Sequence, residues 1–173
     1  MEKEKNTIMM VNRFEGEFIY GFHLKGKYYI NGKLEYEGEY LYGKKYNGKG
    51  YDENGNIIYE LINGNGTVKE YWDKGILKFE GEYLNGKRNG KGKEYYENGS
   101  LMFEGEFLFG RRNGEGKIYN CVGTLLFEGQ LLNGKRNGKG KEYDCFNGNL
   151  KFEGEYLNGE RVKKNIFTSC ICI

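Results

Sequence analysis

The sequence predicts an all-β protein, a solenoid-like ribbon of consecutive antiparallel β-hairpins without substantial helix. The first observation behind this prediction is a repeated motif, an aromatic residue followed by Glu-Gly-Glu or Glu-Gly-Gln. It begins at Phe14, Tyr36, Phe79, Phe103, Phe127 and Phe152. Four of the five intervals are 22 to 25 residues, a period typical of arrays in which each unit packs only against its neighbours. The second observation is composition, because 29 Gly, no Pro and no Ala disfavour helices.

The repeats divide the chain into three parts. Residues 1–13 form an N-terminal tail, residues 14–161 hold about seven hairpin repeats, and residues 162–173 form a C-terminal tail. The one long interval, 43 residues, hides a degenerate unit at 59–78 that lacks the Glu-Gly-Glu core. We expect a kink or an altered groove at this unit. The apolar run from Ile8 to Val11 is too short for a signal peptide or a membrane span, so we expect a cytoplasmic protein.

The unit that begins at Phe79 illustrates one hairpin. Residues 79–84 alternate as a strand does, the Asn-Gly-rich residues 85–90 predict the loop, and residues 91–96 predict the return strand. A loop with an even number of residues places Glu80 and Glu82 on the same face as Lys91 and Lys93. Aromatic residues and glycines then line the opposite face. An odd loop would instead bring Tyr95 beside the aromatic residues; we favour the even loop, although sequence alone leaves the register open.

Composition and motifs give no indication of catalysis. The net charge is +2, so no strong field favours nucleic acid. The four cysteines have neither disulfide nor zinc spacing, the single His23 is interpreted as a packing residue, and no metal or cofactor is expected. Paired glutamates recur in most units beside lysines, which indicates an ion-paired surface rather than a glycosidase pair. We therefore predict that the protein is not an enzyme.

The segment Phe-Glu-Gly-Glu-Tyr-Leu-Asn-Gly-Lys-Arg-Asn-Gly-Lys-Gly at 79–92 resembles the MORN (membrane occupation and recognition nexus) repeat. The resemblance extends from about Phe14 to Arg161. It implies a single-layer, twisted sheet of hairpins with a shallow groove. It also implies a role as a scaffold, tether or dimerisation module, and phospholipid binding has been proposed for such repeats.

Two surfaces are candidate binding sites. The candidate partner groove is formed by the aromatic residues Tyr83, Tyr96, Phe107 and Tyr156. The candidate patch for anionic ligands is formed by the loop cations Lys87, Arg88, Arg111, Arg112, Lys135 and Arg136. We predict a non-enzymatic scaffold that binds a protein partner or self-associates through its exposed strand edges.

The alternative function is a peripheral membrane tether that binds acidic phospholipid. Cys170 stands fourth from the end, where it fits a C-a-a-X prenylation box behind basic residues, although Cys172 is atypical within such a box. The other interpretation of this segment is an apolar tail that caps the last hairpin.

Overall fold

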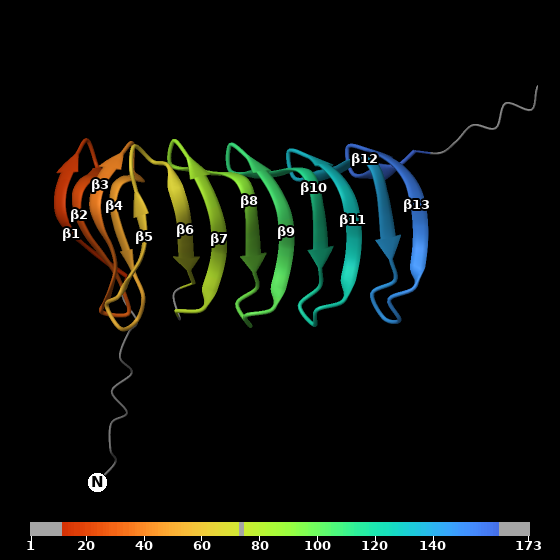
Figure 1. Cartoon of the computed structure of the whole chain (residues 1–173), viewed down its shortest axis with the longest axis horizontal. Helices are drawn as coiled ribbons and strands as arrows, with labels where there is room; N and C mark the ends of the chain where they lie inside the picture. Colours follow the sequence, from red (N-terminus) through yellow and green to blue (C-terminus); the bar gives the residue numbers. More distant parts are fainter. Residues whose placement is uncertain (1–11, 73–74, 163–173) are drawn as a thin grey trace, which may run out of the picture.

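The computed structural model describes residues 12–72 and 75–162, and all regular structure in these residues is β-strand (Figure 1). Consecutive strands pair antiparallel in chain order, which builds a ribbon whose long axis runs across the strands. The predicted all-β ribbon of hairpins is therefore confirmed. The ribbon consists of two open sheets rather than one continuous sheet. Within the described residues, no helix is long and apolar enough to cross a membrane.

The first sheet has five strands. They are β1 (Arg13–Ile19), β2 (Phe22–Ile30), β3 (Lys33–Leu41), β4 (Lys44–Tyr51) and β5 (Ile57–Leu61). The second sheet has nine strands. They are β6 (Gly66–Tyr71), β7 (Leu77–Leu84), β8 (Lys87–Tyr95), β9 (Leu101–Leu108), β10 (Arg111–Tyr119), β11 (Leu125–Leu132), β12 (Lys135–Tyr143), β13 (Leu150–Leu157) and β14 (Glu160–Arg161).

Each hairpin turns through two residues, not through the six that the sequence suggested. In the hairpin of β7 and β8, Asn85 and Gly86 have φ values of 52° and 69°, as a type I′ turn requires. The remaining residues of the predicted loop belong to β8, where a bulge at Gly90 (φ 79°) absorbs the extra length. The turn and the bulge together add an even number of residues between the paired positions, so the side chains of β8 stay on the predicted faces. Glu80 accordingly lies opposite Lys93. The predicted face assignment is confirmed, whereas the predicted loop length is wrong.

Aromatic rings form the core on one face of the ribbon. Phe79, Phe103 and Phe127 have no exposed surface, and each ring lies over glycines of its own hairpin. A Cβ atom built on Gly92 would approach the Phe79 ring to 2.8 Å, so glycine is required beneath it. Phe107 packs edge-on against both Phe79 (5.3 Å) and Phe103 (5.2 Å), which links neighbouring hairpins. The core of this single-layer sheet thus consists of aromatic rings that pack against the strand backbone and against one another.

The degenerate unit separates the two sheets. In the other hairpins, glycine faces glycine across the strands, as Gly81 faces Gly92. At the junction, Leu61 and Val68 occupy this glycine row, and both are buried. Their side chains need space between β5 and β6, and among the described residues only the isolated bridge between Ile62 and Asn65 connects these two strands. The irregularity expected at this unit is thus a break in the hydrogen-bonded ladder of strands, and the aliphatic side chains of Leu61 and Val68 fill the gap.

The seven hairpin turns lie along one edge of the ribbon, which we call the tip edge, and the connections between repeats lie along the other edge (Figure 1). Two residues connect β2 to β3 at that edge, and longer segments connect the later repeats. From Gly64 onward, the N–H of the turn glycine donates to a backbone carbonyl of the preceding hairpin. Examples are Gly86 to Gly64 (2.9 Å) and Gly110 to Arg88 (2.8 Å). These bonds join neighbouring tips to one another along this part of the tip edge.

Candidate functional site

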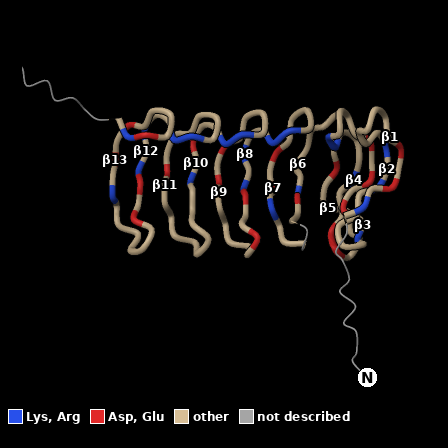
Figure 2. Tube along the Cα trace, turned by 180° about the vertical axis from the view of Figure 1, so that it is seen from behind, with Lys and Arg blue, Asp and Glu red and all other residues tan. Residues whose placement is uncertain are grey.

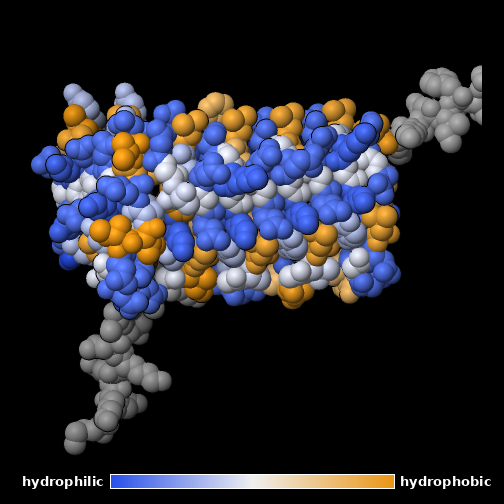
Figure 3. Space-filling model, viewed as in Figure 1, coloured by the Kyte–Doolittle hydropathy of each residue, from blue (hydrophilic) through white to orange (hydrophobic). Residues whose placement is uncertain are grey.

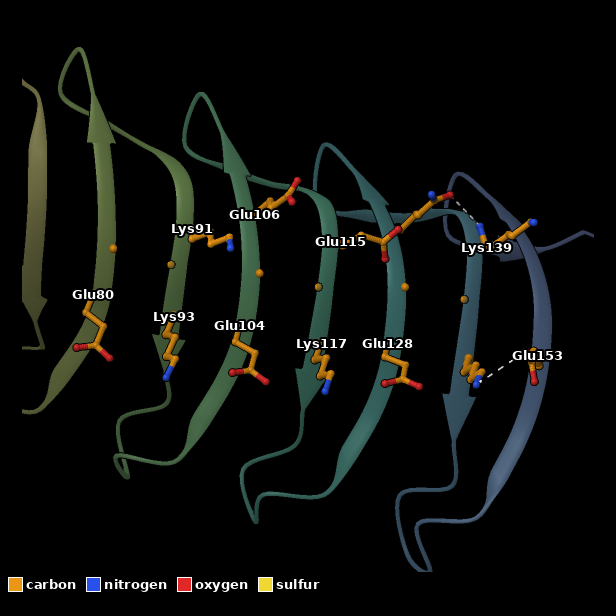
Figure 4. Close-up of a pocket in the computed structure, with 18 of the residues that line it drawn as sticks. Glu80, Lys91, Lys93, Glu104, Glu106, Glu115, Lys117, Glu128, Lys139 and Glu153 are labelled. Carbon is orange, nitrogen blue, oxygen red and sulfur yellow. Dashed lines mark hydrogen bonds and ion pairs between the residues drawn. The ribbon is translucent and has the colours of Figure 1, made fainter.

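A long groove of about 1110 Å³ runs across β6 to β13, perpendicular to the strands (Figure 4). Its floor is the backbone of the glycine row; a Cβ atom on these glycines would point to the aromatic face, as it does at Gly92. The floor glycines are Gly81, Gly92, Gly105, Gly116, Gly129, Gly140 and Gly154. Residues on either side of each glycine project from the face opposite to the aromatic core, so two rows of side chains form the walls.

The walls carry charges of both signs. The first charge row alternates strictly from strand to strand. It consists of Lys69, Glu80, Lys93, Glu104, Lys117, Glu128, Lys141 and Glu153. The second charge row is less regular. It consists of Thr67, Lys91, Glu106, Glu115, Gln130, Lys139 and Glu155. Six lysines oppose seven glutamates, so the groove has almost no net charge. Figure 3 shows the pale floor between two hydrophilic bands.

Tyrosines from the strand ends hold the glutamates of the first charge row. The hydroxyl of Tyr95 donates to Glu80 (2.7 Å) and that of Tyr119 donates to Glu104 (2.8 Å). The same contact recurs between Tyr143 and Glu128 (2.7 Å). Burial and the hydrogen bond to Glu104 raise the pKa of Tyr119 to about 12, so the hydroxyl stays protonated. The regular tyrosine column in the sequence thus fixes one set of charges.

The lysines of the same row are less constrained. Lys141 approaches Glu153 to 3.9 Å, whereas Lys93 and Lys117 form no ion pair with any residue that the structure describes. Figure 4 shows the side chains of Lys93 and Lys117 between neighbouring glutamates, extended along their strands away from the glycine row. Because Glu80, Glu104 and Glu128 accept tyrosine hydroxyls, Lys93 and Lys117 are the less engaged charges of this row.

The aromatic face carries a separate ladder of arginines and glutamates. The Arg88 guanidinium lies 4.2 Å from the centre of the Phe79 ring and pairs with Glu70 (2.8 Å) and Glu94 (2.5 Å). Arg112 also pairs with Glu94 (2.5 Å) and stacks over a phenylalanine ring. Burial alone would raise the pKa of Glu70, but hydrogen bonds from Arg88 and Tyr83 and the charge of Arg88 lower it overall. These arginines cover the aromatic core.

The four predicted groove aromatics do not line the groove. Phe107 and Tyr156 are buried on the opposite face, at 4% and 3% exposure, where they pack against neighbouring rings. Tyr83 packs against Phe79 on that face and donates to Glu70. Tyr96 lies in the connection between β8 and β9, at the edge opposite to the tip edge, and its hydroxyl donates to the carbonyl of Tyr119 (2.9 Å). Sequence reasoning found the aromatic face but missed the glycine-floored groove on the other face.

The six predicted cations are divided between two environments. In each pair the second residue, Arg88, Arg112 or Arg136, stacks on the aromatic core and pairs with glutamate. The first residue of each pair is exposed beside a hairpin turn. These first residues are Lys87, Arg111 and Lys135. Figure 2 shows lysines and arginines gathered near the tip edge. That these cations bind an anionic ligand stays a prediction.

The remaining candidates have simpler positions. His23 stacks on Phe14 with the ring centres 3.8 Å apart, so it is a packing residue. Cys121 and Cys145 are exposed free thiols. Cys170 lies outside the described residues. Within the described residues, no cluster of three or more His, Cys, Asp or Glu side chains is arranged to hold a metal ion.

Comparison with known protein families identifies the repeats. The model of the MORN repeat matches residues 79–101, 103–124 and 127–145, and the model of a MORN repeat variant matches residues 64–85. The chain contains MORN repeats across residues 64–145. No curated protein matches the chain. MORN-repeat proteins are binding and scaffold proteins and are generally non-enzymatic, which fits a site that presents a long surface instead of a reactive centre.

Proposed function

We propose that this MORN-repeat protein is a non-enzymatic scaffold that binds a polypeptide partner along the groove of β6 to β13. The observation that carries this proposal is the groove itself, which runs between two rows of charged side chains over eight strands and has the backbone of the glycine row as its floor. We expect the bound segment to carry charges of both signs, including acidic side chains that meet Lys93 and Lys117.

The dimensions of the groove favour an extended segment. Seven strand intervals of about 4.8 Å give a length of about 34 Å. An extended segment of about ten residues, at about 3.3 Å per residue, spans this length. The partner we expect is a single extended chain with mixed charge, whose side chains can reach both charge rows.

Two charge reversals of equal size test this proposal. Lys93→Glu with Lys117→Glu changes the groove, whereas Lys87→Glu with Lys135→Glu changes the tip edge by the same net charge. Proteins co-isolated from a lysate of the source organism are quantified for the wild type and both variants. We expect the groove variant to lose the specific partner and the tip variant to retain it. Retention by both variants, with both folded by circular dichroism, would contradict groove binding.

A second candidate, a peripheral membrane tether, is favoured by the composition of the tip edge. Leucines and aromatic residues are exposed there; for example, Leu84 is 46% exposed and Phe109 is 68% exposed. Leu84 lies opposite Lys87, whose ammonium group lies 6.0 Å from the centre of the Phe109 ring, and Arg111 and Lys135 follow the next two turns. Figure 3 shows hydrophobic side chains along this edge. Exposed aromatic and aliphatic groups beside cations are typical of surfaces that insert into anionic membranes.

Sedimentation with phosphatidylcholine vesicles, with and without phosphatidylserine, separates the two functions. A tether requires binding to the anionic vesicles that the Lys87→Glu/Lys135→Glu variant loses and the groove variant keeps. Wild-type protein that remains in the supernatant with both kinds of vesicle contradicts the tether and leaves the scaffold.

A further inference from the structure

The first strand of the ribbon repeats the sequence of an interior strand but lacks one of its neighbours. Residues 14–18 of β1 and residues 103–107 of β9 are both Phe-Glu-Gly-Glu-Phe. β9 is paired on both sides, with β8 and with β10. β1 is paired with β2 alone and is the edge strand of its sheet. The side of β1 that is open corresponds to the side of β9 that β8 occupies.

The pairing of β8 with β9 shows which residues complement this side. Lys91 lies opposite Glu106, Gly92 lies opposite Gly105, and Lys93 lies opposite Glu104. The same chemistry recurs at the other interior glutamate strands; Glu37, for example, lies between Lys27 and Lys49. In this ribbon the first glutamate of an interior Glu-Gly-Glu strand is thus flanked by lysines on both sides, and the second glutamate of β9 faces Lys91 of β8.

At β1, the edge strand, only one of the two flanking lysine strands is present in the described part of the chain. Glu15 and Glu17 face Lys27 and Lys25 of β2, and their outer side has no strand among the described residues. Arg13 of the same strand pairs with Glu15 (2.6 Å), but both side chains are largely exposed. Phe18 is 57% exposed, whereas Phe107, its counterpart in β9, is 4% exposed. β1 therefore presents open backbone groups, two glutamates and an uncovered phenylalanine.

We propose that the open edge of β1 recruits an extended, lysine-rich segment of another polypeptide, which adds as an antiparallel strand in the way β8 adds to β9. Backbone hydrogen bonds provide the pairing, and lysines opposite Glu15 and Glu17 provide the selectivity. A second copy does not satisfy this edge through its own β1, because antiparallel pairing of the two would place glutamate opposite glutamate. The edge is distinct from the groove and does not depend on the function proposed for it.

The test uses a peptide that the protein itself supplies. The sequence of β8, KRNGKGKEY, is synthesised with a fluorophore and titrated against the full chain. Two control peptides have the same length. In KRNGEGEEY both central lysines become glutamates, and in the other control alternate backbone nitrogens of KRNGKGKEY are methylated, which removes hydrogen bonds without changing charge. The protein variant Glu15→Lys/Glu17→Lys reverses the charge of the edge.

We expect KRNGKGKEY to bind the wild type and the methylated peptide not to bind. Reversal of two cross-strand pairs should weaken binding about tenfold, and the charge-reversed protein should prefer KRNGEGEEY. Hydrogen exchange should slow in residues 13–19 and stay unchanged in residues 101–108, which have the same core sequence but no open edge.

Three results would overturn the proposal. Equal binding of the methylated peptide would show attraction by charge alone. Protection outside β1 would place the peptide elsewhere. Self-association of the wild type in sedimentation, with protection of β1 in the absence of peptide, would show that a second copy covers the edge.

Discussion

Replacement of Gly38 by alanine should disrupt the first sheet because the new methyl group would meet backbone. A Cβ atom at this position would lie 2.2 Å from the carbonyl oxygen of Asn47 and 2.6 Å from the Cα of Gly48. Ordinary contact distances require β3 and β4 to move apart by about 1 Å. This lengthens the hydrogen bonds on either side of the glycine pair, and the loss of about two of them costs about 2–4 kcal/mol of unfolding free energy.

Two matched substitutions separate this steric effect from the other effects of replacing glycine. Gly110→Ala meets nothing within 4 Å but has a φ of 86°, so it should cost about 1–2 kcal/mol. Gly154→Ala meets the ring of Phe152 on β13, where the ring can turn outward, and should cost about 1 kcal/mol. Urea denaturation followed by circular dichroism measures all three. Equal losses for Gly38→Ala and Gly154→Ala would refute the argument that backbone contact determines the cost.

Three further predictions concern the core, the arginine ladder and the tyrosine column. Leu61→Ala should cost about 2–4 kcal/mol in chemical denaturation because the side chain is buried, whereas Ile57→Ala, 56% exposed, should change stability by less than about 0.5 kcal/mol. Glu94→Gln weakens the pairing of two half-buried arginines and should lower the free energy of unfolding by about 1–3 kcal/mol. Glu97→Gln in the exposed loop should leave it unchanged, and equal effects of the two substitutions would contradict the arginine ladder. The folded-state pKa of Tyr119 is raised to about 12 from 10, so its contribution to stability is complete below pH 10 and is lost as the pH rises toward 12. Absorbance titration of the wild type and Tyr119→Phe checks this, and a tyrosine with an unshifted pKa in the difference curve would contradict it.

The sequence predicted the hairpin ribbon and its two faces because the signals are local. A strand that alternates Phe79, Glu80 and Gly81, followed by Asn85 and Gly86, specifies a strand, a face and a turn without knowledge of distant contacts. The loop length was wrong because Gly90 has the same turn chemistry whether it lies in a loop or in a bulge. Only the pairing of the two strands distinguishes these cases.

The site was harder to predict than the fold because it depends on which side chains are already engaged. Phe107 and Tyr156 are residue types that are common in binding surfaces, yet neighbouring rings bury them. Arg88 is a residue type that is common in anion-binding sites, yet its guanidinium stacks on Phe79 and pairs with Glu70. The glycines were recognised as sites of close packing, but the groove on the opposite face depends on the alignment of charged side chains over many strands. Such alignment is a property of the folded array.

Lysine footprinting tests the central claim most directly. The partner isolated with the wild-type protein is added back, exposed lysines are acetylated, and mass spectrometry compares the bound and free proteins. Binding along the groove predicts protection of Lys93 and Lys117, with unchanged labelling of Lys87 and Lys135 at the tip edge. Protection of Lys87 and Lys135 with continued labelling of Lys93 and Lys117 would contradict the account and place the partner on the tips.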